Sequence, residues 1–152
     1  MGRRLAWRAC ARTPWLPEPD AVGPDPRNFT RWFDANLTTQ IMQFWEAGYV
    51  VHETTMSNGR SHPTPRGEFS IYRRVPNETM ISDEPPDHPD YYNLPNVLYT
   101  QYFSPWFDAL HYAYWHNNFG RPMSHGCLNL RLGDSRLAWE FGAIGTTVVT
   151  HA

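Results

Sequence analysis

The sequence predicts a mainly β domain with one or two short helices. Between residues 31 and 150, short runs rich in aromatic and β-branched residues alternate with turn-forming residues, a spacing typical of consecutive strands. The chain contains 14 Pro and 10 Gly, which favour many chain reversals over long regular elements. One segment near the C-terminus carries the start and stop signals of a helix.

Length and charge limit the possible functions. The 152 residues correspond to about one domain, and 41% of them are hydrophobic, which is enough for a buried core. The formal charge is −2 at pH 7, and arginines are mixed with acidic residues along the chain. No basic stripe is available to neutralise phosphates, so we expect no nucleic-acid partner.

Residues 1–28 are predicted to form a flexible arm ahead of a single domain at 29–152, because prolines are dense in this region. No apolar run approaches the roughly 18 to 20 residues that span a bilayer. Arg8 and Arg12 interrupt what would be the apolar part of a signal peptide, so none is expected. Cys10 has no strand to fix it, and we expect no disulfide with Cys127.

The first strands are expected at residues 32–37, 41–46 and 49–54. Gly48 is placed to turn a hairpin between the second and third strands, and Ser57-Asn58-Gly59 is a strong turn signal after them. A further turn at 64–67 leads into a strand at 68–75, where apolar and polar side chains alternate.

Residues 76–95 are polar and rich in proline, and we expect a long loop without regular structure. Loops of this length within a compact domain commonly serve as lids or binding walls, and the alternative is a solvated insertion. Asp134 is placed to cap a helix at 135–141, which Gly142 ends. The remaining strands are expected at residues 97–103, 109–114 and 145–150.

Aromatic residues are numerous, with eight Tyr, seven Trp and eight Phe. Such side chains combine apolar area with a polar group and suit grooves that hold sugars or extended peptides. The simpler interpretation is an aromatic core between β-sheets.

The run Ser124-His125-Gly126-Cys127-Leu128-Asn129 contains the candidate nucleophile. A thiol attacks an acyl group well only as thiolate, and a histidine partner that takes its proton is the minimal apparatus for acyl transfer. His111 on a predicted strand is the expected partner, with His116 as a rival. A nucleophilic Cys127 is expected to react with a thiol reagent faster than a free thiol at pH 6.

Zinc is the other interpretation of this cluster, because His111, His116, His125 and Cys127 are four potential ligands. Their spacing matches no common zinc arrangement, and no metal site is predicted. Among the remaining histidines, His62 is the most suitable to reach the pocket because it adjoins the turn at 64–67.

Three blocks resemble the catalytic domain of the L,D-transpeptidases, the YkuD-type family of bacterial cell-wall enzymes. Thr64-Pro65-Arg66-Gly67-Glu68-Phe69 is similar to the family's T-P-x-G-x-F segment, and Ser124 to Asn129 is similar to its S-H-G-C-x-N signature. His111 resembles its upstream histidine, although the twelve residues between His111 and Ser124 are slightly fewer than usual. The closing 145–149 segment is similar to its G-T-x-V strand.

The resemblance implies a fold and a set of site residues. The fold would be the YkuD-like mixed β-sheet sandwich. Cys127 would be the nucleophile and His111 the proton donor and acceptor, oriented by the carbonyl of Tyr112, with His125 in support. The backbone N–H groups of Gly126 and Cys127 would form the oxyanion hole. Substrate-binding roles are expected for Ser124, Asn129, Tyr112, Tyr99, Tyr102 and Trp115, with a purely structural role as the alternative for Ser124 and Asn129.

The implied reaction is a two-step acyl transfer on peptidoglycan. Cys127 attacks the third residue of a tetrapeptide stem and expels D-Ala, and an amine of a second stem then captures the acyl group as a 3→3 cross-link. Neither ATP nor a cofactor is expected, since the broken peptide bond supplies the activation. The expected partners are stem peptides and carbapenem inhibitors, and the expected location is periplasmic or cell wall.

Other functions stay open at this level. Water as acceptor would give an L,D-carboxypeptidase, and a lipoprotein lysine would give an anchoring enzyme. A cysteine hydrolase of unrelated specificity is the remaining enzyme alternative. A cell-wall binding domain without catalysis would need neither His111 nor Cys127.

Overall fold

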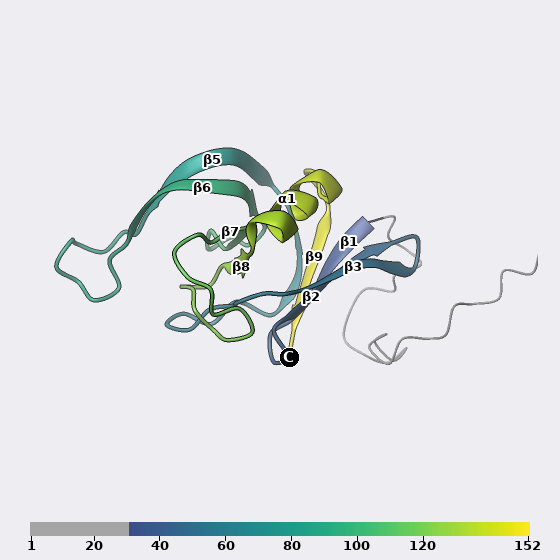
Figure 1. Ribbon diagram of the computed structural model, residues 1–152, viewed down its shortest axis with the longest axis horizontal. Helices are drawn as coiled ribbons and strands as arrows, with labels where there is room; N and C mark the ends of the chain where they lie inside the picture. The colour runs from purple at the N-terminus through teal and green to yellow at the C-terminus, as the bar shows by residue number, and fades with distance from the viewer. Residues whose placement is uncertain (1–30) are drawn as a thin grey trace, which may run out of the picture.

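The computed structural model describes residues 31–152, which form two β-sheets and one helix. Figure 1 shows how they are arranged. The first sheet has the strand order β3-β2-β1-β9-β4. Its β1 pairs antiparallel with β2 and parallel with β9, so the first and last strands of the domain lie side by side. The strands are β1 (Arg31–Asn36), β2 (Ile41–Glu46), β3 (Tyr49–Thr55), β4 (Gly67–Ser70) and β9 (Thr147–His151).

The hairpin between β2 and β3 turns where the sequence predicts it. Ala47 and Gly48 both have positive φ, at 50° and 83°, as a two-residue hairpin turn matched to strand twist requires. The expected arm at 1–28, including Cys10, lies outside the described residues.

The second sheet has the strand order β5-β6-β7-β8. Its last two strands are parallel and the others antiparallel, so both sheets are mixed. The predicted fold, a mainly β sandwich of mixed sheets with one or two short helices, is confirmed, with one helix among the described residues. The strands are β5 (Arg73–Ile81), β6 (Asn93–Tyr102), β7 (Ala109–Tyr112) and β8 (Leu128–Leu130).

The prediction of a structureless loop at 76–95 is wrong at both ends. Residues 76–81 complete β5, residues 93–95 begin β6, and the connecting loop is only 82–92. Prolines are tolerated here because β5 is an edge strand and the pairing of both strands is irregular near Pro76 and Pro95. The result is a long hairpin that projects from the domain (Figure 1).

Two other boundaries differ from expectation. The predicted strand at 68–75 is two strands, β4 and β5, which belong to different sheets, and β8 was not predicted. Helix α1 (Leu132–Phe141) begins three residues earlier than expected, after Arg131. Asp134 is therefore in the first turn of the helix and not at the cap. In the first turn its carboxylate still interacts favourably with the helix dipole. Gly142 ends the helix as predicted.

The main core lies between the two sheets and under α1. Phe33 and Phe44 from the first sheet meet Leu110 and Leu128 from the second, and Ala138 of α1 joins the same cluster. A smaller cluster on the other face of the first sheet is built on stacked Trp32 and Trp45, with ring centroids 5.4 Å apart. These aromatic residues form core, which supports the simpler interpretation for them.

Within residues 31–152, no helix is long and apolar enough to cross a membrane.

Candidate active site

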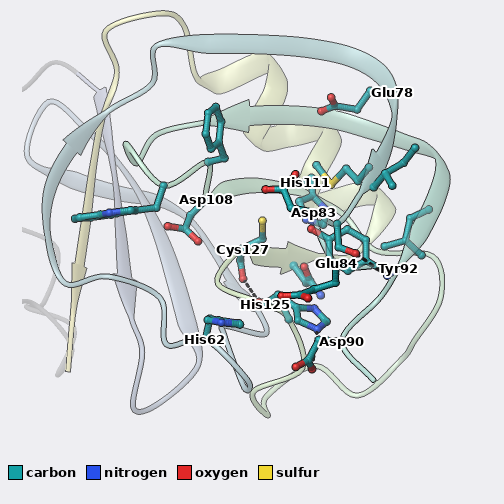
Figure 2. Close-up of a pocket in the computed structure, with 18 of the residues that line it drawn as sticks. His62, Glu78, Asp83, Glu84, Asp90, Tyr92, Asp108, His111, His125 and Cys127 are labelled. Atoms are coloured by element: carbon teal, nitrogen blue, oxygen red, sulfur yellow. Dashed lines mark hydrogen bonds and ion pairs between the residues drawn. The ribbon is translucent and has the colours of Figure 1, made fainter. Parts of the chain in front are cut away.

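A cleft of about 750 Å³ opens at the edge of the second sheet. One wall is the β5–β6 hairpin with its loop, and the other is the turn before β7 together with the segment that precedes β8. Figure 2 shows Cys127 between these walls, with His111 on one side and His62 on the other.

The pairing of β7 with β8 places His111 and Cys127 on one face of the sheet. His111 is in register with Asn129, and Cys127 lies two residues before Asn129. Because side chains in a strand alternate with a period of two, Cys127 and Asn129 project toward the same side. A predicted nucleophile and base that are 16 positions apart in the sequence thus line one cleft.

The thiol of Cys127 is half-buried, in surroundings that disfavour a negative charge on the sulfur. Burial raises its pKa to about 12, and the carboxylates of Asp108 and Glu78 add to the effect. The backbone N–H of Ala109 acts in the opposite direction by hydrogen-bonding the sulfur. This raised pKa favours a neutral thiol in the free protein and argues against fast reaction with a thiol reagent at pH 6, which stays a prediction to be tested.

His111 is buried, with 2% of its surface exposed. Its Nδ1 lies 3.0 Å from the carbonyl oxygen of Tyr112, and because a carbonyl only accepts, Nδ1 carries the proton. Nε2 is consequently free to take a proton. The pKa of His111 is lowered to about 4, mainly by burial and in smaller part by the nearby His116, against the opposing effect of the Tyr112 hydrogen bond, so the ring is neutral at physiological pH.

His116, the rival base, does not line the cleft. Its Nε2 contacts the side-chain amide of Asn129 at 2.9 Å, and its Nδ1 accepts from the Asn118 backbone at 3.2 Å. Both ring nitrogens are thus engaged, and the ring packs on Phe119 with centroids 4.9 Å apart. The geometry favours His111 as the partner of Cys127.

The segment before Cys127 is held by hydrogen bonds from its own residues and from the turn at 64–67. Ser124 Oγ donates to the carbonyl of Cys127 at 2.5 Å and accepts from the Gly126 N–H at 3.1 Å. Thr64 Oγ1 donates to the carbonyl of Gly126 at 2.6 Å. The Gly126 N–H is therefore already engaged, which leaves the Cys127 N–H as the candidate oxyanion donor of the expected pair.

His125 lies on the loop side of the cleft. Its Nε2 is 3.6 Å from Asp90 Oδ1, and its ring packs on Tyr92 with centroids 5.1 Å apart. Burial raises the pKa of Tyr92, and the negative charge of an ionised Cys127 raises it further. The Tyr92 hydroxyl thus stays protonated in the cleft that Cys127 also lines, and a protonated hydroxyl is a possible donor to an oxyanion.

Of the four aromatic residues expected to bind substrate, two line the cleft and two do not. Tyr102 and Trp115 line the cleft, and the Tyr102 hydroxyl donates to Glu78 at 3.0 Å. Tyr99 packs instead against Trp139 of α1, with ring centroids 6.0 Å apart. Tyr112 contributes its carbonyl to His111.

Ser124 and Asn129 both touch the cleft and both support the surrounding chain. The backbone of Asn129 exchanges two hydrogen bonds with Ser57, at 2.8 and 3.0 Å, and its side chain holds His116. These contacts agree with the structural alternative for both residues.

The charge lining the cleft is the main feature that sequence reasoning missed. Five carboxylates and three histidines line it, and none of the described lining residues is an arginine. The residues are Glu78, Asp83, Glu84, Asp90 and Asp108 with His62, His111 and His125. The acidic run at 83–90 is visible in the sequence. Whether these residues face the cleft depends on where the β5–β6 hairpin ends, which the sequence does not show. Within residues 31–152, His, Cys and acidic side chains form no group of three suited to a metal ion.

Comparisons with solved structures agree with this architecture. An L,D-transpeptidase from Mycobacterium smegmatis superposes with a TM-score of 0.76 at 24% identity, over 81% of this chain and 59% of that chain. L,D-transpeptidase 3 from Mycobacterium tuberculosis, in complex with a faropenem-derived adduct, gives 0.75 at 24%, over 81% and 60%. A mutant Enterococcus faecium L,D-transpeptidase gives 0.72 at 22%, over 81% and 50%.

The chain thus spans 50% to 60% of the length of these solved chains. No curated protein gives a significant match. The family model of the L,D-transpeptidase catalytic domain matches residues 30–150. Since that match covers most of the sequence, the chain belongs to the YkuD family of L,D-transpeptidase catalytic domains.

Proposed function

We propose that this protein is a peptidoglycan L,D-transpeptidase that forms 3→3 cross-links through a thioester on Cys127. The observation that carries the proposal is the neutral His111, whose Nδ1 is fixed by the Tyr112 carbonyl beside Cys127 in the same cleft. The other ring nitrogen is then available to accept the thiol proton. This is the arrangement that an activated cysteine nucleophile requires.

Acylation begins from a neutral pair. With the thiol pKa near 12 and the His111 pKa near 4, an ion pair is strongly disfavoured in the free protein. Proton transfer from Cys127 to His111 therefore accompanies attack on the donor carbonyl. His111 then gives this proton to the nitrogen of the departing D-Ala, and the thioester remains.

The oxyanion of the tetrahedral intermediate would be held by the N–H of Cys127 and the hydroxyl of Tyr92. Both groups are neutral donors on residues that line the cleft, and losing one such donor typically costs roughly 3 kcal/mol of transition-state stabilisation. A cleft of about 750 Å³ is large enough for a peptide segment.

The substrate class follows from the family and from the charge of the cleft. The donor is a tetrapeptide stem, and the acceptor is an amine of a second stem, whose positive charge suits the five carboxylates. This favours an amine over water in the second step. Peptidoglycan lies outside the cytoplasmic membrane, so we propose an extracytoplasmic location.

Inhibition by β-lactams follows from the same thiol. The relative from Mycobacterium tuberculosis carries a faropenem-derived adduct, and we propose that carbapenems acylate Cys127 here. Intact mass measured after incubation with a carbapenem, with Cys127→Ala beside it, is the direct check.

The test of function is mass spectrometry of disaccharide-tetrapeptide incubated with the protein, beside the Cys127→Ala variant. Loss of D-Ala with a cross-linked dimer supports the transpeptidase. Loss of D-Ala without a dimer would instead indicate a carboxypeptidase, and no Cys127-dependent change would overturn an enzymatic role on this substrate.

A further inference from the structure

Two aromatic side chains that line the cleft are mostly exposed to solvent. Trp106 and Phe107 are consecutive, and 69% and 68% of their surfaces are exposed. No other large hydrophobic side chain among the described residues is as exposed. Neither ring packs on another aromatic ring within residues 31–152, whereas Trp32 and Trp45 are stacked and buried. Packing in the core therefore does not explain this pair.

The turn at 104–108 that carries the pair has a fixed, buried base. Ser104 Oγ accepts from the backbone N–H of Trp106 at 3.2 Å and of Asp108 at 3.1 Å. The same hydroxyl donates to Asp108 Oδ2 at 2.5 Å, and the Ser104 carbonyl accepts from the Phe107 N–H at 3.2 Å. Because the turn is already ordered, little backbone freedom is lost when a ligand binds to it.

Phe107 is held in a strained backbone conformation. Its φ is +66°, in the left-handed region that residues other than glycine rarely adopt. The strain does not bury the side chain, since the ring stays exposed at the cleft. Strain of this kind beside a site is typical of a residue that is placed for binding or catalysis.

The aromatic pair is close to Cys127. Asp108 follows Phe107 directly, and a β-carbon at Gly126 would stand 2.1 Å from Asp108 Oδ1. The charge of Asp108 acts on the Cys127 thiol, and Figure 2 shows the two side chains near each other. Trp106 is two residues before Asp108, which is at most about 7 Å of extended chain.

The sugar that carries a donor stem would lie at a similar distance from Cys127. In the proposed reaction, the thiol attacks the carbonyl of the third stem residue. Three extended residues span roughly 10 Å, so the first sugar ring lies about that far from the sulfur. The aromatic pair is therefore within reach of this ring.

A sugar ring suits both the aromatic pair and the charge of the cleft. Its C–H faces can stack on the negative face of an aromatic ring, and its hydroxyls can donate to carboxylates. The described lining residues include five carboxylates and no arginine, which disfavours an anionic group. An aliphatic peptide side chain would use the rings but not the carboxylates, whereas an uncharged sugar uses both.

On the basis of the proposed function, we propose that Trp106 and Phe107 form a saccharide subsite that binds the sugar ring next to the donor stem. The protein then selects stems that are attached to glycan over free stem peptides. The subsite binds a part of the substrate that does not react, so its contribution appears in KM and not in kcat.

The experiment compares two donors that differ only in the sugar. Acylation of Cys127 is followed by intact mass with disaccharide-tetrapeptide and with the free tetrapeptide. The wild-type protein should use the disaccharide-tetrapeptide about tenfold more efficiently. Trp106→Ala should remove most of this preference by raising the KM for the saccharide donor, while acylation by the free tetrapeptide changes less than twofold.

Further variants separate binding from a structural role. Trp106→Phe keeps an aromatic face and should keep most of the preference. Phe107→Gly suits the backbone conformation, so it should lower the preference without lowering the temperature of thermal unfolding. Tyr49→Ala is the matched control, because Tyr49 is an aromatic residue that is 65% exposed but does not line the cleft.

A binding measurement tests the subsite without the reaction. The stem-free disaccharide is titrated into the Cys127→Ala variant, and the indole N–H signal of Trp106 is followed by NMR. Its assignment comes from the loss of the signal in Trp106→Phe. A saturable shift of this signal is expected, and it should be absent for the indole signals of the buried Trp32 and Trp45.

The outcomes distinguish this inference from the proposed function. If Trp106→Ala slows acylation by both donors equally, or by neither, the saccharide subsite is overturned while the transpeptidase proposal stands. If the wild-type protein forms no acyl-enzyme with either donor, the proposed function fails, and the NMR titration decides the subsite. In that case, an unchanged Trp106 signal would overturn it, and a saturable shift would support a saccharide site without this reaction.

Discussion

The carboxylate of Asp108 lies directly against the backbone of Gly126, the residue before Cys127. A β-carbon at position 126 would stand 2.1 Å from Asp108 Oδ1. Gly126 also has φ +124°, a conformation that side-chain-bearing residues rarely adopt. The geometry of the Cys127 segment therefore depends on the absence of a side chain at this position.

Gly126→Ala should lower the free energy of unfolding by about 2 kcal/mol or more, because backbone strain and a clash with a fixed carboxylate act together. Acylation of Cys127 should fall by more than tenfold. Thermal unfolding and intact mass after incubation with donor measure the two effects. The matched control is Gly133→Ala, where a β-carbon meets nothing within 4 Å. An equally small effect of both substitutions would contradict the prediction.

The thiol of the free protein should be slow to alkylate. Because only the thiolate reacts, a shift of the pKa from 9.0 to about 12 lowers the rate at pH 8 by up to about 10³-fold relative to an ordinary cysteine. The rate of iodoacetamide labelling between pH 6 and 10 checks this, in a Cys10→Ser background that leaves one thiol. Labelling of Cys127 at the rate of a free peptide thiol would contradict it.

Asp108→Asn should make the same thiol more reactive. Removing a negative charge near the sulfur favours the thiolate, so the pKa of Cys127 falls and alkylation at pH 8 becomes severalfold faster. The same labelling assay detects the change, and Asp34→Asn, remote from the cleft in the first sheet, serves as control. An unchanged or slower rate would show that Asp108 does not act on the sulfur through its charge.

The sequence predicted most strands because their aromatic and β-branched runs are bounded by turn residues. It missed β8, since the three residues Leu128–Leu130 are too few for any periodicity to be visible. It also assigned Tyr99 to the cleft with Tyr102. Residues three apart in a strand face opposite sides, and Tyr99 has φ +59° where β6 is irregular.

The pair of Cys127 and His111 could be predicted, because its residues lie in a specific motif. The walls of the cleft could not, since they depend on long-range packing. The turn that begins at Ser104 brings Asp108 to Cys127. The β5–β6 hairpin brings Asp90 to His125, and its prolines had led to the prediction of a loop instead. The charge of a site formed by separate segments depends on the tertiary structure, so it cannot be read from the sequence alone.

Substitution of the two neighbouring histidines should have opposite consequences. His111→Gln removes the proton acceptor of the thiol and should slow acylation by about 10² to 10⁴-fold with the fold retained. His116→Gln should leave acylation within a few fold, but it disrupts contacts to Asn129 and Asn118 and should lower the free energy of unfolding by about 1 kcal/mol. Acylation rates and thermal unfolding, measured on both variants, distinguish them. The reverse pattern would make His116 the base.

The pH dependence of acylation should reflect the burial of His111. Its pKa is lowered to about 4, so the ring can still accept a proton at pH 5, where an ordinary histidine is mostly protonated. The acylation rate should therefore be nearly constant from pH 8 to pH 5 and fall only below that. A loss with a midpoint near 6.5 would contradict the assignment.

The buried imidazole of His111 should make the protein less stable in acid. The pKa of His111 is 6.5 for an unperturbed ring and about 4 in the folded state, so below pH 6.5 the unfolded chain binds a proton that the folded one does not. This contribution to stability is fully present above pH 6.5 and is lost as the pH falls toward 4, by at most about 1.4 kcal/mol per pH unit. His111→Gln should reduce this slope in thermal unfolding between pH 7 and pH 4. An unchanged slope would mean that the folded protein can protonate His111 without the cost that its burial implies.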